Sequence, residues 1–317
     1  MNVALIGSVS SSYHCLEALI RGGVEITGVL GLDESCAAAV SDYRPLRSLA
    51  VEAGLPFLPF VKVTEPAVEE FLTIHTPDLL WVIGLSQLVP DRIIEIARHG
   101  GVGFHPTMLP EGRGRAPVAW TILLGARAAV SLFYLTDAPD AGDIIAQREV
   151  PVLPDDYSED LIQRTNEVLT DVVLELAPLI KAGTVPRTPQ DHTQATLYSK
   201  RSPHDGLIDW HDPTDSIYRL VRAAGRPYPG AFSFLQGCKT TIWRARPAAP
   251  PKSDAMQPPI EAGTILHADA EQGVLVKTAD GAIWLTEAVL EGAPGSALHN
   301  VAIVGAVFTP TQNREEH

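Results

Sequence analysis

Residues 1–30 read MNVALIGSVSSSYHCLEALIRGGVEITGVL, and this stretch decides the fold. Residues 1–6 and 24–30 are short apolar runs rich in branched side chains, as expected of strands that are buried on both faces. Between them, apolar residues recur at helical spacing from Cys15 to Ile20. A strand, a helix and a second strand in this order predict a parallel pair that is joined by a crossover helix.

The same alternation continues outward from this unit. Further apolar runs predict buried strands, and the stretches between them have helical periodicity. A long helix over residues 158–181 closes the series and ends before Gly183. The sequence therefore predicts an α/β catalytic domain over residues 1–185, a doubly wound and mostly parallel sheet with helices on both faces. The expected strands are 79–83, 102–104 and 130–134, and the expected helices include 46–53, 68–72 and 93–97.

The pattern changes after this domain. Residues 186–203 are polar and rich in helix and strand breakers, which predicts an exposed linker. One helix, 214–224, is followed by short strand-like segments with turn residues between them, so residues 204–310 are expected to form a small antiparallel β-barrel of the OB-like kind. The proline-rich residues 247–259 are expected to be a loop. The five expected strands are 231–235, 240–245, 263–266, 273–278 and 282–289.

The composition narrows the class of protein. The chain has 317 residues, with 24 Lys and Arg against 38 Asp and Glu, a formal charge of −14 that should repel nucleic acid and anionic lipid. No apolar run reaches the roughly 18 residues of a membrane span, and the first residues lack the pattern of a signal peptide. Three well-separated cysteines form no disulfide framework. We expect a cytoplasmic enzyme without nucleic-acid or membrane partners, whose oligomeric state is open.

Several common motifs are missing from the sequence. The first strand ends in Gly7-Ser8-Val9-Ser10 rather than in G-x-G-x-x-G, which gives little support to NAD binding. There is no P-loop, no H-E-x-x-H and no G-x-S-x-G. The ten histidines are scattered along the chain, so no metal is expected.

Residues 101–147 stand out, and read GVGFHPTMLPEGRGRAPVAWTILLGARAAVSLFYLTDAPDAGDIIAQ. His105 follows a strand, at the edge where open α/β sheets bind ligands, and Asp140 follows the strand 130–134. Two adjacent strand ends can bring these side chains together. The alternative is structural, with His105 capping a turn and Asp140 forming an Asx turn.

This stretch resembles the 10-formyltetrahydrofolate-dependent formyltransferase family. The resemblance rests on His-Pro-x-x-Leu-Pro, then Arg-Gly and Ala-Pro before a Trp-containing helix, then Asp-x-Gly-Asp-Ile. Residues 198–246, with Asp-Gly-x-Ile-x-Trp and Pro-Gly-Ala-Phe, resemble the carboxyl-terminal barrel of the same family. Nearly the whole chain is covered by the two matches.

The resemblance implies a site and a co-substrate, 10-formyltetrahydrofolate. His105 is then the imidazole at the reacting centre, and Asp140 orients His105 and helps to remove the proton of the attacking amine. No covalent enzyme intermediate is needed. The residues expected beside the folate are Ser86, Gln87, Met108, Leu109, Pro110 and Asp137.

Gly103 departs from the family pattern, which has Asn two residues before the histidine. An Asn amide would help to hold the oxyanion, and losing such a donor typically costs on the order of 10²–10³ in rate. Three accounts are open. In the first, another donor replaces the Asn, such as a backbone N–H or a water in the space beside the glycine, which a neighbouring side chain can also enter. In the second, the enzyme is a formyltetrahydrofolate hydrolase. In the third, the one-carbon donor or the substrate is unusual and the site is remodelled.

The expected formyl acceptor is the amine of a small molecule. Arg113 and Arg115 can hold an anionic part of it, since guanidinium forks suit phosphate and carboxylate, or they can be solvated loop charges. The barrel resembles that of formyltransferases for nucleotide-linked amino sugars, and enzymes that formylate natural-product precursors such as hydroxyornithine also fit. Methionyl-tRNA is disfavoured, because residues 186–203 and 247–317 carry no basic stripe. A catalytically inactive folate-binding protein is a further alternative.

Overall fold

The computed structural model describes residues 1–248, 260–292 and 298–311. The chain forms two compact units, and each is described by itself. The first contains residues 1–121, 127–152 and 161–200, and the second contains residues 122–126, 153–160 and the chain from residue 201 onward. The domain boundaries expected at residues 185, 204 and 310 stay a prediction.

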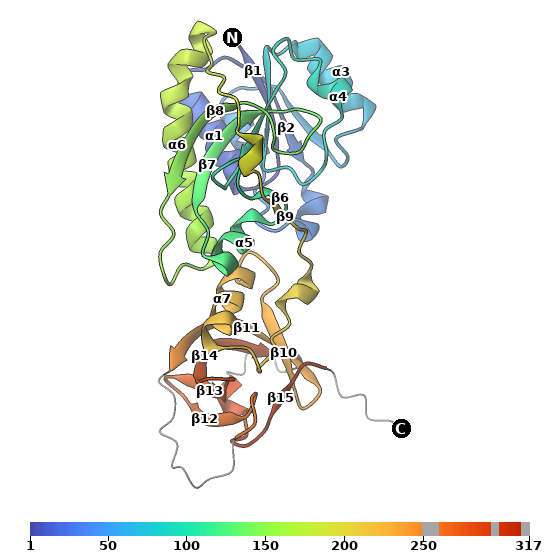
Figure 1. Cartoon of the computed structure of the whole chain (residues 1–317). Coiled ribbons are helices and arrows are strands. Elements are labelled where there is room, and N and C mark those ends of the chain that lie inside the picture. The colour runs from blue at the N-terminus through green and yellow to red at the C-terminus, as the bar shows by residue number, and fades with distance from the viewer. Residues whose placement is uncertain (249–259, 293–297, 312–317) are drawn as a thin grey trace. The chain divides into compact units, whose positions relative to one another are not determined.

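A seven-stranded sheet forms the centre of the first unit, in the order β3-β2-β1-β4-β5-β7-β8 (Figure 1). The strands from β3 to β5 are parallel, β7 is antiparallel to β5, and β8 is antiparallel to β7. The predicted mostly parallel sheet is confirmed. Its strands are β1 (Val3–Gly7), β2 (Ile26–Leu32), β3 (Phe57–Phe60), β4 (Leu79–Ile83), β5 (Gly101–His105), β7 (Ala128–Tyr134) and β8 (Ile144–Val150).

Helices cover both faces of this sheet. The residues of α3 (Pro66–His75) and α4 (Asp91–Ile94) join a buried cluster with β1, β2 and β4 on one face. On the other face, α1 (Ser10–Arg21) lies beside α6 (Ser158–Ala182), and Asn166 of α6 donates a hydrogen bond to Ser10 at 2.8 Å (Figure 1). The remaining helices are α2 (Arg47–Glu52) and α5 (Pro117–Leu124).

Two edge strands, β3 and β8, were not expected from the sequence. Pro59 interrupts the apolar run of β3, a residue that strands tolerate at an edge. In β8 only Ile145 and Val150 are buried, and polar residues lie between them, so the strand has no continuous apolar run. A short parallel pair also forms, in which β6 (Arg113–Gly114) is bonded to β9 (Leu197–Tyr198). Residues 186–203 are therefore more than an exposed connection, although most of them are exposed.

A six-stranded antiparallel sheet forms the second unit, in the order β12-β13-β14-β11-β10-β15. The sheet curls so far that its two edges meet. At this junction the Ile265 N–H donates to the Ala306 carbonyl at 2.8 Å, and the Phe308 N–H donates to the Gly263 carbonyl at 2.9 Å. The helix α7 (Thr214–Ala224) packs against it. The strands are β10 (Ala231–Leu235), β11 (Cys238–Ala248), β12 (Ile265–Asp269), β13 (Gly273–Lys277), β14 (Ala282–Leu290) and β15 (Phe308–Thr309).

This small antiparallel barrel was predicted, with two corrections. The short sixth strand, β15, was missed, because two residues are too few to give a periodic signal. Residues 247 and 248 of the expected proline-rich loop instead end β11, and the remaining residues, 249–259, lie outside the described part of the chain.

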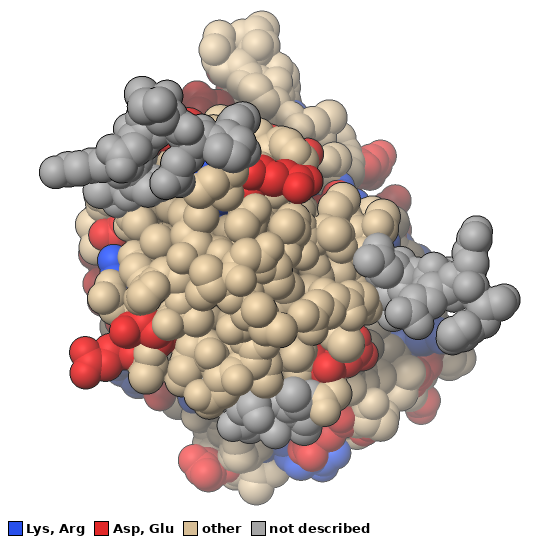
Figure 2. Space-filling model, turned by 90° about the horizontal axis from the view of Figure 1, so that it is seen from below, with Lys and Arg blue, Asp and Glu red and all other residues tan. Residues whose placement is uncertain are grey.

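The surface charge of the second unit is unevenly distributed. Figure 2 looks at this unit from the side of β12 and β15. No charged side chain is visible at the centre of this face, and more Asp and Glu than Lys and Arg are visible around its edge (Figure 2). Within the ranges that the structure describes, no helix has both the length and the apolar character needed to cross a bilayer.

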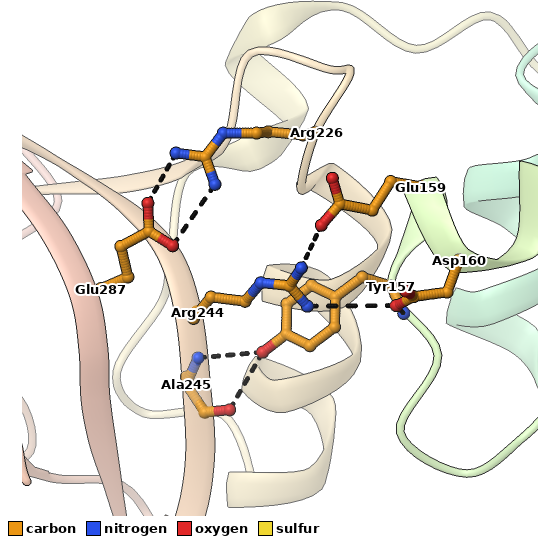
Figure 3. A network of polar contacts seen from close by, with 7 residues as sticks. All are labelled: Tyr157, Glu159, Asp160, Arg226, Arg244, Ala245 and Glu287. Carbon is orange, nitrogen blue, oxygen red and sulfur yellow. Dashed lines mark hydrogen bonds and ion pairs between the residues drawn. The ribbon is translucent and has the colours of Figure 1, made fainter. Parts of the chain in front are cut away.

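A polar network ties the segment before α6 to β11 within the second unit (Figure 3). The strand is irregular between Ile242 and Ala245, and the Tyr157 hydroxyl bonds to both the N–H and the carbonyl of Ala245 at 3.0 Å. Arg244 lies over the Tyr157 ring at 4.0 Å and pairs with Glu159. Tyr157 thus satisfies two buried backbone groups that the sheet leaves unpaired.

Replacing Tyr157 by Phe should leave those two groups without a partner. We expect the free energy of unfolding of the second unit to fall by about 1–3 kcal/mol, and the Ala245 amide to exchange faster with deuterium. Tyr13→Phe is the control, since the Tyr13 hydroxyl has no hydrogen-bond partner among the described residues. Equal protection of Ala245 in both variants would contradict this role.

Candidate active site

His105 is the last residue of β5, and its imidazole is buried, with 5% of the residue exposed. The ring Nε2 lies 2.8 Å from the Gly112 carbonyl oxygen. Because a carbonyl only accepts hydrogen bonds, Nε2 carries the proton, and the neutral ring has its lone pair on Nδ1. Burial lowers the pKa of His105, against the opposing effects of Asp140 and of the Gly112 hydrogen bond. The geometry thus presents a neutral base with one accepting nitrogen.

Asp140 is the group that Nδ1 faces. Its Oδ2 lies 3.7 Å from Nδ1 of His105 and accepts the Gly114 N–H at 2.8 Å. The structure therefore brings together the histidine and the carboxylate predicted from the sequence. Gly114 has φ +108°, and a Cβ there would lie 2.4 Å from the Tyr198 carbonyl, so only glycine lets β6 approach β9 this closely.

The role of Asp140 as the group that orients the ring, like the carboxylate of a triad, stays a prediction. In this structure the 3.7 Å between its Oδ2 and Nδ1 of His105 is too long for a hydrogen bond. The Gly112 carbonyl fixes the tautomer instead. While the ring is neutral, the lone pair on Nδ1 of His105 faces a lone pair on Oδ2 of Asp140. A proton on Nδ1 would make the contact between these two atoms attractive. Asp140 is thus placed to stabilise the protonated ring.

The loop that carries Asp140 is held by Gln190. The Gln190 amide donates to the carbonyls of Asp140 and Gly142 at 2.9 and 2.6 Å. Asp140 has φ +54°, a left-handed conformation that Asp tolerates better than most residues. A Cβ at Gly142 would lie 1.8 Å from the Tyr134 carbonyl, so the turn needs glycine at that position.

The position of the missing Asn, Gly103, is filled by neighbours. A Cβ at Gly103 would lie 2.7 Å from the Phe133 ring and 2.8 Å from the Leu135 side chain. Side chains of Phe133 and Leu135 therefore fill the space where a side chain at position 103 would begin, and both are apolar. What holds the oxyanion in place of an Asn stays a prediction.

The residues expected beside the folate differ in their surroundings, and their role stays a prediction. The Gln87 amide bonds to the backbone of Val61 and Val63, both at 2.8 Å, and the buried Leu109 gives its carbonyl to Gln147. The Gln87 side-chain amide and the Leu109 carbonyl are thus engaged in hydrogen bonds within the protein. The others are exposed or half-buried and keep their side chains accessible, namely Ser86, Met108, Pro110 and Asp137.

The two arginines expected at the substrate lie in different places. Arg113 is 9% exposed, and its guanidinium donates to Gln190 at 2.6 Å and to His192 Nδ1 at 3.0 Å. Both contacts use the same nitrogen, Nη2, while Nε is buried and has no hydrogen-bond partner among the described residues. The role of Arg113 at the substrate stays a prediction. Arg115 is exposed and keeps its side chain available.

Sequence reasoning missed Gln190 and the glycine backbone of the site. Gln190 lies in the polar segment 186–203, fifty residues after Asp140, and nothing in its neighbourhood distinguishes it from an exposed linker residue. Gly112 has φ +70° and a Cβ there would lie 2.6 Å from the Tyr198 ring, so the position needs glycine, but the sequence does not connect this glycine with His105. Among the described residues, no cluster of His, Cys, Asp and Glu could hold a metal ion.

Two sequence families match the chain, the "Formyl transferase" family over residues 3–176 and the "Formyl transferase, C-terminal domain" family over residues 200–300. Together they match residues 3–300 except for residues 177–199.

Solved structures with a similar fold include HypX from Aquifex aeolicus in complex with tetrahydrofolic acid, with a TM-score of 0.66 and 21% identity. That match covers 91% of this chain and 44% of HypX, so the chain spans less than half of HypX. An N-formyltransferase from Helicobacter canadensis in complex with folinic acid and dTDP-3-aminofucose has a TM-score of 0.61 and 14% identity, and the match covers 90% of this chain and 98% of that one. A methionyl-tRNA formyltransferase from Clostridium thermocellum has a TM-score of 0.55 and 19% identity, and the match covers 78% of this chain and 93% of that one.

Restoring a side chain with Gly103→Asn should strain the sheet. The new Cβ must displace Phe133 and Leu135, so we expect a loss of about 1–3 kcal/mol in the free energy of unfolding, measured by denaturant titration. Gly54→Asn is the control, because position 54 has φ +67° and open space around it, which Asn tolerates. If Gly103→Asn left the free energy of unfolding unchanged, Phe133 and Leu135 could not fill the space beside position 103.

Asp140→Asn should change the titration of His105. The carboxylate favours the imidazolium, so removing its charge should lower the pKa of His105 further below its usual range. Titration of His105 followed by NMR measures this directly. Asp137→Asn is the matched control on the same loop, exposed and without effect on His105. A His105 pKa that stays in place or rises in Asp140→Asn would contradict the geometry.

Proposed function

Because the chain belongs to the formyl transferase family, we propose that it moves a formyl group from 10-formyltetrahydrofolate to the amine of a small molecule. The observation that carries the proposal is the buried His105, whose Nε2 lies against the Gly112 carbonyl and whose Nδ1 faces Asp140. The folds shared with proteins solved with tetrahydrofolic or folinic acid support the choice of donor.

Formyl transfer to an amine needs a base. The amine nitrogen attacks the formyl carbon, and the resulting ammonium must lose a proton before the bond to the folate nitrogen breaks. Nδ1 of His105 is the accepting atom, because Nε2 already donates to Gly112. His105 then returns the proton to the departing folate nitrogen, so that charge and atoms balance over the cycle.

Asp140 supports the charged form of His105. Once Nδ1 is protonated, the carboxylate 3.7 Å away stabilises the imidazolium, and both side chains are less than one-fifth exposed. The lowered pKa of His105 keeps the ring neutral and ready at the start of each cycle. Gly103 offers no amide for the oxyanion, so we assign that task to a backbone N–H or a bound water.

A small amine is the acceptor that the charges favour. Figure 2 shows a face of the second unit with few Lys and Arg, and the whole chain carries a formal charge of −14, which disfavours a tRNA. The acceptor we propose is a nucleotide-linked amino sugar or a natural-product precursor such as hydroxyornithine, with Arg115 as a contact for its anionic part. The structure of the Helicobacter canadensis relative in complex with dTDP-3-aminofucose supports a nucleotide-linked amino sugar.

The test is whether turnover depends on an amine. We expect 10-formyltetrahydrofolate alone to be consumed slowly, and a panel of dTDP-linked amino sugars and N-hydroxyornithine to include an amine that accelerates tetrahydrofolate release. His105→Gln should lower that rate by about 10²–10⁴, the usual contribution of a general base. His99→Gln, at an exposed histidine, is the matched control and should keep the wild-type rate.

Formate released at the full rate without any amine would contradict the proposal and identify a hydrolase. The wall of Phe133 and Leu135 beside Gly103 bears on the same question, since it supplies no side chain to orient a water there. Acceleration by methionyl-tRNA alone would overturn the choice of a small acceptor.

A further inference from the structure

We infer that Gln190 is a positioning residue, which holds the loop of residues 140–142 so that the Asp140 carboxylate faces His105. The inference rests on the proposed function only for the loss of activity that it predicts. Its geometric content concerns the protein alone and can be tested without any substrate.

The first step is the contact with the loop. Gln190 is 8% exposed, and its amide nitrogen donates to two carbonyls of one tight turn, those of Asp140 and Gly142. An amide group has two N–H donors, so both are used on this turn. Asp140 adopts the left-handed conformation, which costs free energy and persists only where its surroundings enforce it. Gln190 supplies that enforcement.

The second step concerns what fixes Gln190 itself. Its carbonyl oxygen accepts from the Arg113 guanidinium at 2.6 Å, and the same Arg113 nitrogen lies 3.0 Å from Nδ1 of His192. A guanidinium only donates, so the amide oxygen must point toward Arg113 and the amide nitrogen toward the loop. The orientation of the Gln190 amide is therefore determined.

The third step shows that the contacts form a closed ring. Arg113 and Gly114 are the two residues of β6. Gly114 bonds to the carboxylate of Asp140, while Arg113 acts through Gln190 on the carbonyl of the same residue. Side chain and backbone of Asp140 are thus held from one short strand. Loss of Gln190 removes both side-chain contacts to the backbone of this turn, while the carboxylate keeps its one hydrogen bond, to the Gly114 N–H.

The experiment compares Gln190→Ala with Gln194→Ala, a control at an exposed glutamine four residues further along. In Gln190→Ala we expect kcat to fall by about 10², the scale of a misplaced catalytic group, with KM for 10-formyltetrahydrofolate nearly unchanged. The pKa of His105, followed by NMR in the substrate-free protein, should fall because the carboxylate moves away. Gln194→Ala should change neither quantity.

A second variant separates positioning from stability. Gln190→Glu keeps an acceptor for Arg113. Its carboxylate has no hydrogen to donate, however, so the carbonyls of Asp140 and Gly142 lose their hydrogen bonds. We expect this variant to lower kcat as Gln190→Ala does, while it remains folded; the His105 pKa is compared only for Gln190→Ala, because the added carboxylate itself favours the imidazolium. If Gln190→Ala lowers the melting temperature but leaves the His105 pKa at its wild-type value, Gln190 is merely structural and the inference is overturned.

The combination with Asp140→Asn shows the route of the effect. If Gln190 acts through Asp140, Gln190→Ala should shift the His105 pKa in the wild-type background and have no further effect in Asp140→Asn. An equal shift in both backgrounds would overturn the inference. These readouts do not depend on the reaction, so an inactive or hydrolytic protein would refute the proposed function without touching this result.

Discussion

The hydrogen bond from His105 to the Gly112 carbonyl is the interaction on which the rest of the site depends. At 2.8 Å it places the proton of the neutral imidazole on Nε2 and leaves Nδ1 as an acceptor. The rest of the site follows from this assignment. Asp140 cannot hold the neutral ring from 3.7 Å, but it can stabilise the ring once Nδ1 has taken a proton. In the proposed reaction, His105 as the base and Asp140 as the group that stabilises its charged form thus have separate tasks.

The fold supplies this arrangement from segments far apart in the chain. His105 ends a parallel strand, Asp140 follows an antiparallel one, and the two strands are neighbours in the sheet. The Gly112 and Gly114 backbone is brought to them by the pairing of β6 with β9, which draws in residues of the polar segment after α6. That segment therefore belongs to the architecture of the site as well as to the connection between the units.

How far the sequence predicts this protein depends on the kind of signal each part leaves. Buried strands such as β1 and β4 are continuous apolar runs, so their place and type could be predicted. The edge strands β3 and β8 leave only a broken apolar pattern, and both were missed. His105 and Asp140 could be found from their position after strands and from the family resemblance. Gln190 could not, because a glutamine in a polar segment gives no sign that it reaches a site fifty residues away in sequence.

The measurement that tests the account most directly is the tautomer of His105. The ¹⁵N chemical shifts of the two ring nitrogens, assigned by comparison with His105→Gln and recorded at neutral pH, distinguish a protonated nitrogen from one that carries a lone pair. The account predicts a neutral ring with the proton on Nε2 and a lone pair on Nδ1. A proton on Nδ1 with a bare Nε2, or a doubly protonated ring at neutral pH, would contradict it.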